Sequence, residues 1–182
     1  MRATTATIHL EALRHNLKRV RALAPRAKVM AVVKADGYGH GLERVAQALS
    51  GADAFGVATL TDAERVRRAG LNHRVVLLSG YDEPRDLALV RELRIDCVIH
   101  HESQLAILER HPPQGPISLW IKLDTGMHRL GFAPEQARRA YERVRALPQV
   151  AEIRWMTHFA CADDHDTERT EAQMARFRAA IG

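Results

Sequence analysis

Residues 29–41 read VMAVVKADGYGHG, and this stretch largely decides the fold. An apolar, β-branched run ends at Lys34 and passes directly into a turn that contains Gly37, Gly39 and Gly41. Such a run is typical of a strand that helices cover on both faces of a parallel sheet. The stretch therefore predicts a βα unit whose strand carries a lysine at its carboxyl end.

The same alternation of a short apolar run and a longer amphipathic stretch continues along the chain. The expected strands are Val29–Val33, Ala54–Val57, Val75–Leu78, Cys97–Ile99, Ile117–Leu123 and Ile153–Met156. The expected helices are Leu10–Leu23, Leu42–Leu49, Leu60–Ala69, Pro84–Glu92, Glu102–Arg110, Pro134–Leu147 and Thr167–Ala180. A short strand, Thr4–Ile8, is expected before the first helix, and the prolines at 84 and 134 are placed as helix starts.

Six βα units predict an α/β fold of the TIM-type (β/α)8 barrel class, truncated after about six units. An open, doubly wound sheet is the alternative. A closed barrel needs all eight strands to remove its edges, and the sequence stops directly after a helical pattern. We therefore expect an incomplete barrel within a chain of 182 residues, a length that allows one domain or one domain and part of another.

Composition excludes several classes of function. The 27 Lys and Arg against 22 Asp and Glu give a net charge of +5, but the arginines recur at helical spacing and aromatic residues are only 5%. This favours solvated helix faces over a nucleic-acid surface. There is no signal peptide or run of eighteen apolar residues, and the two cysteines lie far apart. We therefore expect a cytoplasmic protein with no nucleic-acid partner and no membrane span.

Lys34 is a candidate for covalent chemistry because of its place at a strand end. The active sites of barrel enzymes lie at that end, and a lysine amine there can form a Schiff base with the carbonyl of pyridoxal phosphate (PLP). The glycines allow a sharp turn and a close backbone approach, and the hydroxyl of Tyr38 could reach a phosphate oxygen. A lysine beside an ordinary turn is the simpler alternative, and the residues alone leave both open.

The strand Ile117–Leu123 also ends in a charged loop, within the sequence ISLWIKLDTGMHRLGF. Period-two alternation places Lys122 on the same face as Ser118 and Trp120, so the lysine points into a barrel or toward a helix layer. Arg129 follows in the loop, where its guanidinium could bind a carboxylate or a phenolate oxygen. A surface arginine and a lysine with a solvated head group are the simpler alternatives.

The strand Ile153–Met156 leads to His158, whose imidazole could lie against a planar ring or relay a proton. A histidine satisfied in the core or in a loop is the simpler alternative. The acidic cluster at residues 163–166 precedes a helical pattern, which favours a helix cap over a metal site. We expect no bound metal.

The three segments VVKADGYGHG, KLDTGMHRLGF and THFACAD resemble motifs of bacterial alanine racemases, which are fold-type III PLP enzymes. The resemblance spans the whole chain, with one departure at Gly37, where many members have alanine. It implies that residues 1–182 form an incomplete N-terminal, PLP-binding barrel domain without the C-terminal β-domain. The implied reaction is the interconversion of L- and D-alanine, which supplies D-alanine for peptidoglycan.

The resemblance also implies a role for each candidate residue. Lys34 would carry PLP and act as the base on the D-alanine face, and Tyr38 would contact the cofactor phosphate. Arg129 would approach the phenolic oxygen of PLP and the substrate carboxylate, while His158 would lie near the pyridine ring. Lys122 matches a lysine that is carbamylated in many members and that orients the arginine.

In the family, the base on the opposite face is a tyrosine from the partner subunit's β-domain, so the full-length enzyme is a homodimer. No tyrosine in this sequence matches that base. We therefore expect the 182-residue chain alone to be incompetent as a racemase, and residues 4–8 to lack sheet partners. The alternatives are an amino-acid racemase of broader specificity, a non-catalytic PLP-binding barrel protein and an α/β chain without a ligand.

Overall fold

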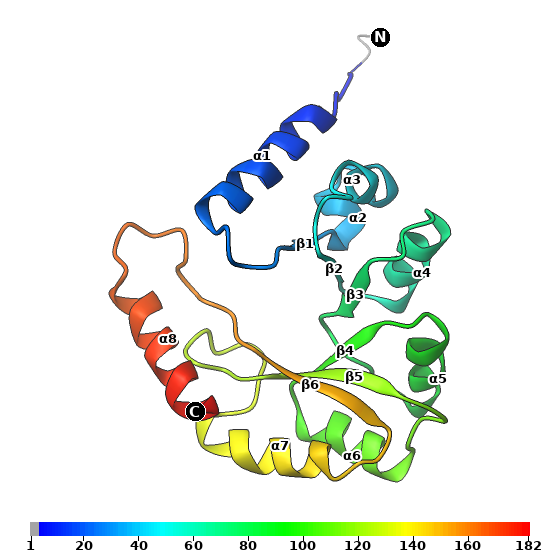
Figure 1. Cartoon of the computed structure of the whole chain (residues 1–182), viewed down its shortest axis with the longest axis vertical. Coiled ribbons are helices and arrows are strands. Elements are labelled where there is room, and N and C mark those ends of the chain that lie inside the picture. The colour runs from blue at the N-terminus through cyan, green and yellow to red at the C-terminus, as the bar shows by residue number, and fades with distance from the viewer. Residues whose placement is uncertain (1–3) are drawn as a thin grey trace. The chain divides into compact units, whose positions relative to one another are not determined.

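The computed structural model describes residues 4–182. Strands and helices alternate along the chain (Figure 1). The chain divides into two compact units, Met1–Leu78 and Ser79–Gly182, which are described separately below. In the described part of the chain, no helix has both the length and the apolar character that a membrane span requires.

In the first unit, three short parallel strands alternate with helices. Its elements are α1 (Leu10–Leu23), β1 (Met30–Val32), α2 (Lys34–Tyr38), α3 (Leu42–Ala48), β2 (Ala54–Val57), α4 (Leu60–Arg68) and β3 (Arg74–Leu77). β2 pairs with both β1 and β3, with Ala54 opposite Met30 and Arg74. All four residues of β2 are buried, as expected for a central strand covered on both faces.

In the second unit, three parallel strands follow the same βα order. Its elements are α5 (Pro84–Glu92), β4 (Asp96–Ile99), α6 (Glu102–Arg110), β5 (Ile117–Lys122), the 3-10 turn η1 (Pro134–Gln136), α7 (Ala137–Arg145), β6 (Val150–Met156) and α8 (Glu168–Ile181). β5 pairs with both β4 and β6. In Figure 1, α5, α6 and α7 follow one another along one side of these strands. The repeated βα order confirms the predicted α/β class.

Local sequence signals explain where several helices begin. The Thr59 side chain accepts a hydrogen bond from the backbone N–H of Asp62 and caps α4. α5 begins at Pro84 as predicted, and Asp86 in its first turn accepts from the N–H of Glu83. The helix expected from Pro134 opens with a 3-10 turn before the α-helix starts at residue 137.

Three expectations from the sequence need correction. The predicted strand Thr4–Ile8 does not form: as the resemblance implied, these residues have no sheet partner, and a strand requires a hydrogen-bonded neighbour. β6 begins at Val150, three residues earlier than expected, because its pairing with β5 extends past a local irregularity at Ile117 and Ser118. The glycine-rich turn after β1 contains a short helical turn, α2, which the sequence did not predict.

Candidate functional site

Lys34 lies two residues after the end of β1, and the sheet holds Val33 between them. The N–H of Val33 donates to the carbonyl of Gly56 on β2, 2.8 Å away, and the Val33 side chain is completely buried. Lys34 itself is half-buried. The sheet therefore fixes the backbone next to the lysine, while the residue keeps part of its surface exposed.

The chain then makes a left-handed helical turn. The φ angles are +52° at Ala35, +53° at Asp36, +61° at Gly37 and +55° at Tyr38. Within the turn, the N–H of Gly37 donates to the carbonyl of Val33 at 2.9 Å. Left-handed residues other than glycine cost about 1–3 kcal/mol each and concentrate at functional sites. The turn is therefore strained backbone that the rest of the unit must stabilise.

The turn presents Tyr38 to solvent and packs Gly37 against α3. The Tyr38 side chain is 58% exposed, so its hydroxyl is available to a ligand. A Cβ at Gly37 would lie 3.0 Å from a methyl group of Val45, whereas a Cβ at Gly39 would meet no atom within 4 Å. The backbone at Gly39 therefore has open space beside it.

Lys122 is the last residue of β5 and is only 7% exposed. Its carbonyl accepts a hydrogen bond from the N–H of Phe132 at 2.9 Å, and its backbone lies opposite Met156 of β6. Trp120, two residues earlier on the same strand face, donates through Nε1 to Asp96 at 2.8 Å. The predicted alternation along β5 thus places this lysine on a face with further polar contacts.

The loop that carries Arg129 is closed upon itself by Asp124. Its Oδ1 accepts from the N–H groups of Gly126, Met127 and His128 at 3.0–3.1 Å. Burial tends to raise the pKa of the Asp124 carboxyl, but these N–H groups together with His128 outweigh it and hold the pKa below its ordinary value. Arg129 is exposed on this well-anchored loop.

His158 lies two residues after the end of β6 and is exposed, and Gln173 of α8 fixes its backbone. Gln173 is only 2% exposed; its Nε2 donates to the carbonyl of His158 at 3.0 Å and its Oε1 accepts from the N–H of Ala160 at 2.9 Å. Nε2 also lies 3.4 Å from the hydroxyl of Thr125 in the Arg129 loop. One buried amide therefore joins the two loops that carry Arg129 and His158.

The second unit thus brings together Lys122 and the loops of Arg129 and His158, whereas Lys34 and Tyr38 belong to the first unit. The sequence did not single out Asp124, Thr125 or Gln173. Asp124 bonds to N–H groups two to four residues ahead, so its position directly after a predicted strand and before a glycine was a local signal for its role. The contacts of Thr125 and Gln173 join residues far apart in the sequence and follow no local pattern.

The acidic cluster at residues 163–166 serves the start of α8, as its position before a helical pattern suggested. Oδ1 of Asp166 accepts from the N–H of Glu168 at 3.0 Å. Over residues 4–182, no three or more His, Cys, Asp or Glu side chains are grouped in a way that could hold a metal ion.

Comparison with known proteins identifies the family. Residues 8–182 match the model of "Alanine racemase, N-terminal domain". The alanine racemase of Shewanella loihica is 51% identical over 173 residues, which cover 94% of this chain and 48% of the relative. The alanine racemase of Vibrio parahaemolyticus is 47% identical, over 97% of this chain and 50% of the relative. The chain therefore spans about half the length of these relatives.

Solved structures agree with the sequence relatives. The crystal structure of the biosynthetic alanine racemase from Pseudomonas aeruginosa matches with a TM-score of 0.89 and 41% identity, over 93% of this chain and 48% of that one. The alanine racemase from Corynebacterium glutamicum matches with a TM-score of 0.85 and 33% identity, over 100% of this chain and 52% of that one. The predicted class, the N-terminal part of a TIM-type barrel, is confirmed. The chain belongs to the alanine racemase N-terminal domain family.

Proposed function

We propose that this chain is the PLP-binding N-terminal domain of an alanine racemase, spanning residues 1–182, and that alanine is the substrate. The observation that carries the proposal is Lys34, held at the end of β1 and followed by a strained left-handed turn. Strain of this kind persists where a function requires a particular geometry. The sequence relatives at about 50% identity support alanine as the amino acid.

The residues of the first unit fit PLP chemically. Lys34 offers a half-buried primary amine for the cofactor aldehyde, and Tyr38 offers an exposed hydroxyl for the phosphate. The open space beside Gly39 leaves room for a ligand along the turn. When bound, PLP supplies the electron sink that makes the α-proton of an amino acid removable.

In this proposal, Lys34 has a second role as a base. Once its Nζ is free, the neutral amine can accept the α-proton on one face of the substrate and return it. By the family resemblance this is the D-alanine face. Because the sheet fixes the backbone beside Lys34, Nζ would move mainly by rotation of its own side chain, which favours proton transfer on one face of the substrate.

Arg129 and His158 would act on the substrate and on the cofactor ring. The guanidinium of Arg129 can form two parallel hydrogen bonds with the alanine carboxylate, and the contacts of Asp124 hold its loop for that purpose. His158 would lie against the pyridine ring of the cofactor. The hydrogen bond from Gln173 to its carbonyl restricts the backbone that carries the imidazole.

Lys122 is proposed to be carbamylated. Carbamylation converts a cationic ammonium into an anion that can accept hydrogen bonds from Arg129. Lys122 is only 7% exposed, so a change in the charge of its side chain would act directly on the neighbouring groups. We further propose a cytoplasmic location and a homodimer for the full-length protein; the free cysteines, Cys97 and Cys161, are in keeping with a reducing compartment.

The test of the cofactor site is the visible absorption spectrum of the purified chain with added PLP. We expect a long-wavelength band in the wild type, no band in Lys34→Ala, and borohydride trapping that labels the peptide containing Lys34. Lys28→Ala is the matched control, since Lys28 is an exposed lysine before the same strand and should leave the band unchanged. A band that survives in Lys34→Ala, or its absence in the wild type, would refute the proposed site.

A further inference from the structure

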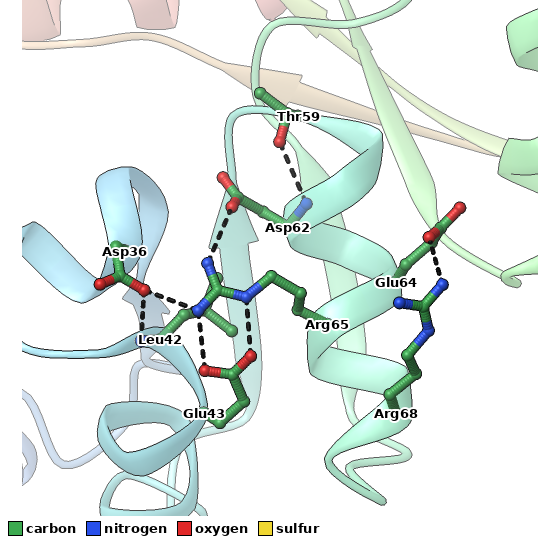
Figure 2. Close-up of polar contacts among 8 residues, drawn as sticks. All are labelled: Asp36, Leu42, Glu43, Thr59, Asp62, Glu64, Arg65 and Arg68. Atoms are coloured by element: carbon green, nitrogen blue, oxygen red, sulfur yellow. Dashed lines mark hydrogen bonds and ion pairs between the residues drawn. The ribbon is translucent and has the colours of Figure 1, made fainter.

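An arginine on α4 reaches the left-handed turn that follows Lys34 (Figure 2). Arg65 donates through Nη2 to Oδ1 of Asp36 at 2.6 Å, and through Nε and Nη2 to both carboxylate oxygens of Glu43 at 2.7 and 2.8 Å. Its Nη1 lies 3.9 Å from a carboxylate oxygen of Asp62. One guanidinium therefore connects three elements: the turn α2, the helix α3 and its own helix α4.

Asp36 is the member of this cluster that acts on the turn. It is the second of five consecutive left-handed residues, Ala35 to Gly39, and lies between Lys34 and Tyr38. The same Oδ1 that contacts Arg65 accepts a hydrogen bond from the N–H of Leu42, the first residue of α3, at 3.1 Å. Asp36 also accepts from the N–H of Gly41 through its carbonyl at 2.8 Å. Its position is therefore defined from both ends of the turn.

The charges favour this arrangement. Hydrogen bonds from Arg65 and from the N–H of Leu42 hold the pKa of Asp36 below its ordinary value, and Arg65 does the same to Glu43. The two carboxylates in turn raise the pKa of Arg65, so the guanidinium stays charged. The three side chains are 30–53% exposed, so the cluster contributes local order more than global stability.

Arg68, one turn further along α4, shows what an ordinary surface pair looks like in the same helix (Figure 2). It is 76% exposed and pairs with Glu64 four residues earlier on α4. The start of α4 has its own cap, because the Thr59 hydroxyl oxygen accepts a hydrogen bond from the N–H of Asp62 at 3.0 Å. Loss of Arg65 would therefore leave α4 formed but remove the tie to the turn.

We propose that Arg65 is a positioning residue: through Asp36 it holds the left-handed turn that sets the directions of Lys34 and Tyr38. The proposal rests on the proposed function of Lys34 as the PLP lysine. Arg65 itself touches neither the cofactor nor the substrate in this account. Its contribution is to offset the strain of a turn in which three of five left-handed residues are not glycine.

The first experiment needs no cofactor. We would measure amide hydrogen exchange over residues 35–42 in the wild type, in Arg65→Met and in the matched control Arg68→Met, at a temperature well below unfolding. Arg65→Met should exchange about two- to tenfold faster at the amides of Gly41 and Leu42, in line with the modest strength of partly exposed ion pairs. Arg68→Met should match the wild type, and protection in the strands should be unchanged in both. Equal protection at residues 35–42 in all three proteins would overturn the proposal.

The second experiment measures the Kd for PLP from the long-wavelength band of each variant. We expect the Kd for PLP to rise about two- to tenfold in Arg65→Met and to stay unchanged in Arg68→Met. Arg65→Lys should give an intermediate Kd, because an ammonium can replace only part of the hydrogen bonds that the guanidinium makes. A purely structural role would lower the unfolding midpoint and leave the Kd of the folded protein unchanged, which would overturn the proposal.

The two experiments separate this proposal from the function on which it rests. If the wild type takes up no PLP, the proposed function fails, and the exchange measurement alone decides whether Arg65 holds the turn. Should Arg65→Met not fold, Asp36→Asn tests the same link, because the amide keeps an oxygen for the N–H of Leu42 but loses the charge that pairs with Arg65. Wild-type exchange and Kd in Asp36→Asn would equally overturn the proposal.

Discussion

Gly131 shows how one residue without a side chain shapes the loop of Arg129. Its φ is +133°, and a Cβ there would lie 2.5 Å from the N of Asp124 and 2.7 Å from the carbonyl carbon of Leu123. Gly131→Ala should therefore lower the free energy of unfolding by about 2–4 kcal/mol, because backbone strain and a backbone clash add together. Denaturant unfolding of the purified chain measures this loss.

Gly70 provides the control for that substitution. Its φ is +79°, but a Cβ would meet no atom within 4 Å. Gly70→Ala should cost only the strain of a left-handed alanine, about 1 kcal/mol. If both substitutions lower the free energy of unfolding by the same amount, the close backbone approach at Gly131 does not contribute to stability. The loop would then be able to shift to accommodate a Cβ.

Acid should weaken the contacts that hold the turn after Lys34, because the two carboxyl groups in those contacts have lowered pKa values. Asp36 and Glu43 have folded-state pKa values below their ordinary ones, chiefly through hydrogen bonds from Arg65. Their contribution to stability is thus fully present above the unfolded values of about 4 and is lost as the pH falls through the lower folded values. We expect exchange at Leu42, corrected for its intrinsic rate, to rise below about pH 4.

Carboxyl titration by NMR checks this expectation directly. Asp36 and Glu43 should titrate below the ordinary ranges of their residue types in the wild type and move upward in Arg65→Met. Glu64, which pairs with Arg68 on the same helix, serves as an internal reference that the substitution should not affect. An Asp36 that titrates at its ordinary pKa in the wild type would contradict the contacts around Arg65.

Among single residues, the sequence predicts the sharp turns at the glycines better than the positive φ angles of their neighbours. Gly37, Gly39 and Gly41 were expected to turn sharply, and all have positive φ. Ala35 and Tyr38 also have positive φ, yet neither residue type signals it. Their conformation depends on contacts such as that between Asp36 and Arg65, which lie 29 residues apart. The chemical roles of Lys34, Tyr38, Arg129, His158 and Lys122 stay predictions.

Replacement of Gln173 should weaken the contacts between helix α8 and the two loops that carry Arg129 and His158. Gln173→Leu has a similar volume but removes the bonds to His158, Ala160 and Thr125, and it leaves the N–H of Ala160 without its acceptor. We expect a loss of about 1–3 kcal/mol in the free energy of unfolding, the usual cost of an unsatisfied buried polar group. Faster exchange at the Ala160 amide should accompany it.

Gln47→Leu is the matched control, because Gln47 is an exposed glutamine on α3. The same chemical change there should alter the free energy of unfolding by no more than about 0.5 kcal/mol. A Gln173→Leu protein as stable as this control, with unchanged exchange at Ala160, would show that the buried amide is dispensable for the two loops.

The elements themselves were largely predictable because strands buried on both faces appear as continuous apolar runs. β2, α1, α5 and α6 have the predicted bounds. The errors occur where strand pairing sets the bounds: β6 gains three residues from its register with β5, and the strand pattern at residues 4–8 forms no strand because it has no partner, an absence that only the resemblance implied. Neither effect is visible in the local pattern of a single segment.

For the whole molecule, the sequence predicted a barrel from the rhythm of its βα units, and the solved relatives confirm that class. Of the candidate residues, Lys34 and Tyr38 belong to the first compact unit, and Arg129 and His158 belong to the second. Local patterns can predict each unit separately. They contain no information about the chemistry that a lysine, arginine or histidine at a strand end performs, so the roles of these residues rest on the family resemblance.

Racemisation requires a proton acceptor on each face of the α-carbon, and the tyrosines of this chain are poorly suited to be the second one. Tyr81 is only 1% exposed, its hydroxyl donates to the carbonyl of Gln104 at 2.9 Å, and burial raises its pKa. Tyr141 is stacked on Trp155 with ring centroids 5.8 Å apart. Tyr38 is the proposed contact of the cofactor phosphate.

We therefore expect the 182-residue chain with PLP to leave the chirality of alanine unchanged, even when the cofactor is attached to Lys34. Chiral chromatography after incubation with L- or D-alanine measures this, with Lys34→Ala as the background. Racemisation that disappears in Lys34→Ala would contradict the expectation and would mean that this chain supplies both faces. Tyr38→Phe would then be the decisive variant: its hydroxyl is the exposed one, so loss of racemisation there would move Tyr38 from the phosphate to the second face.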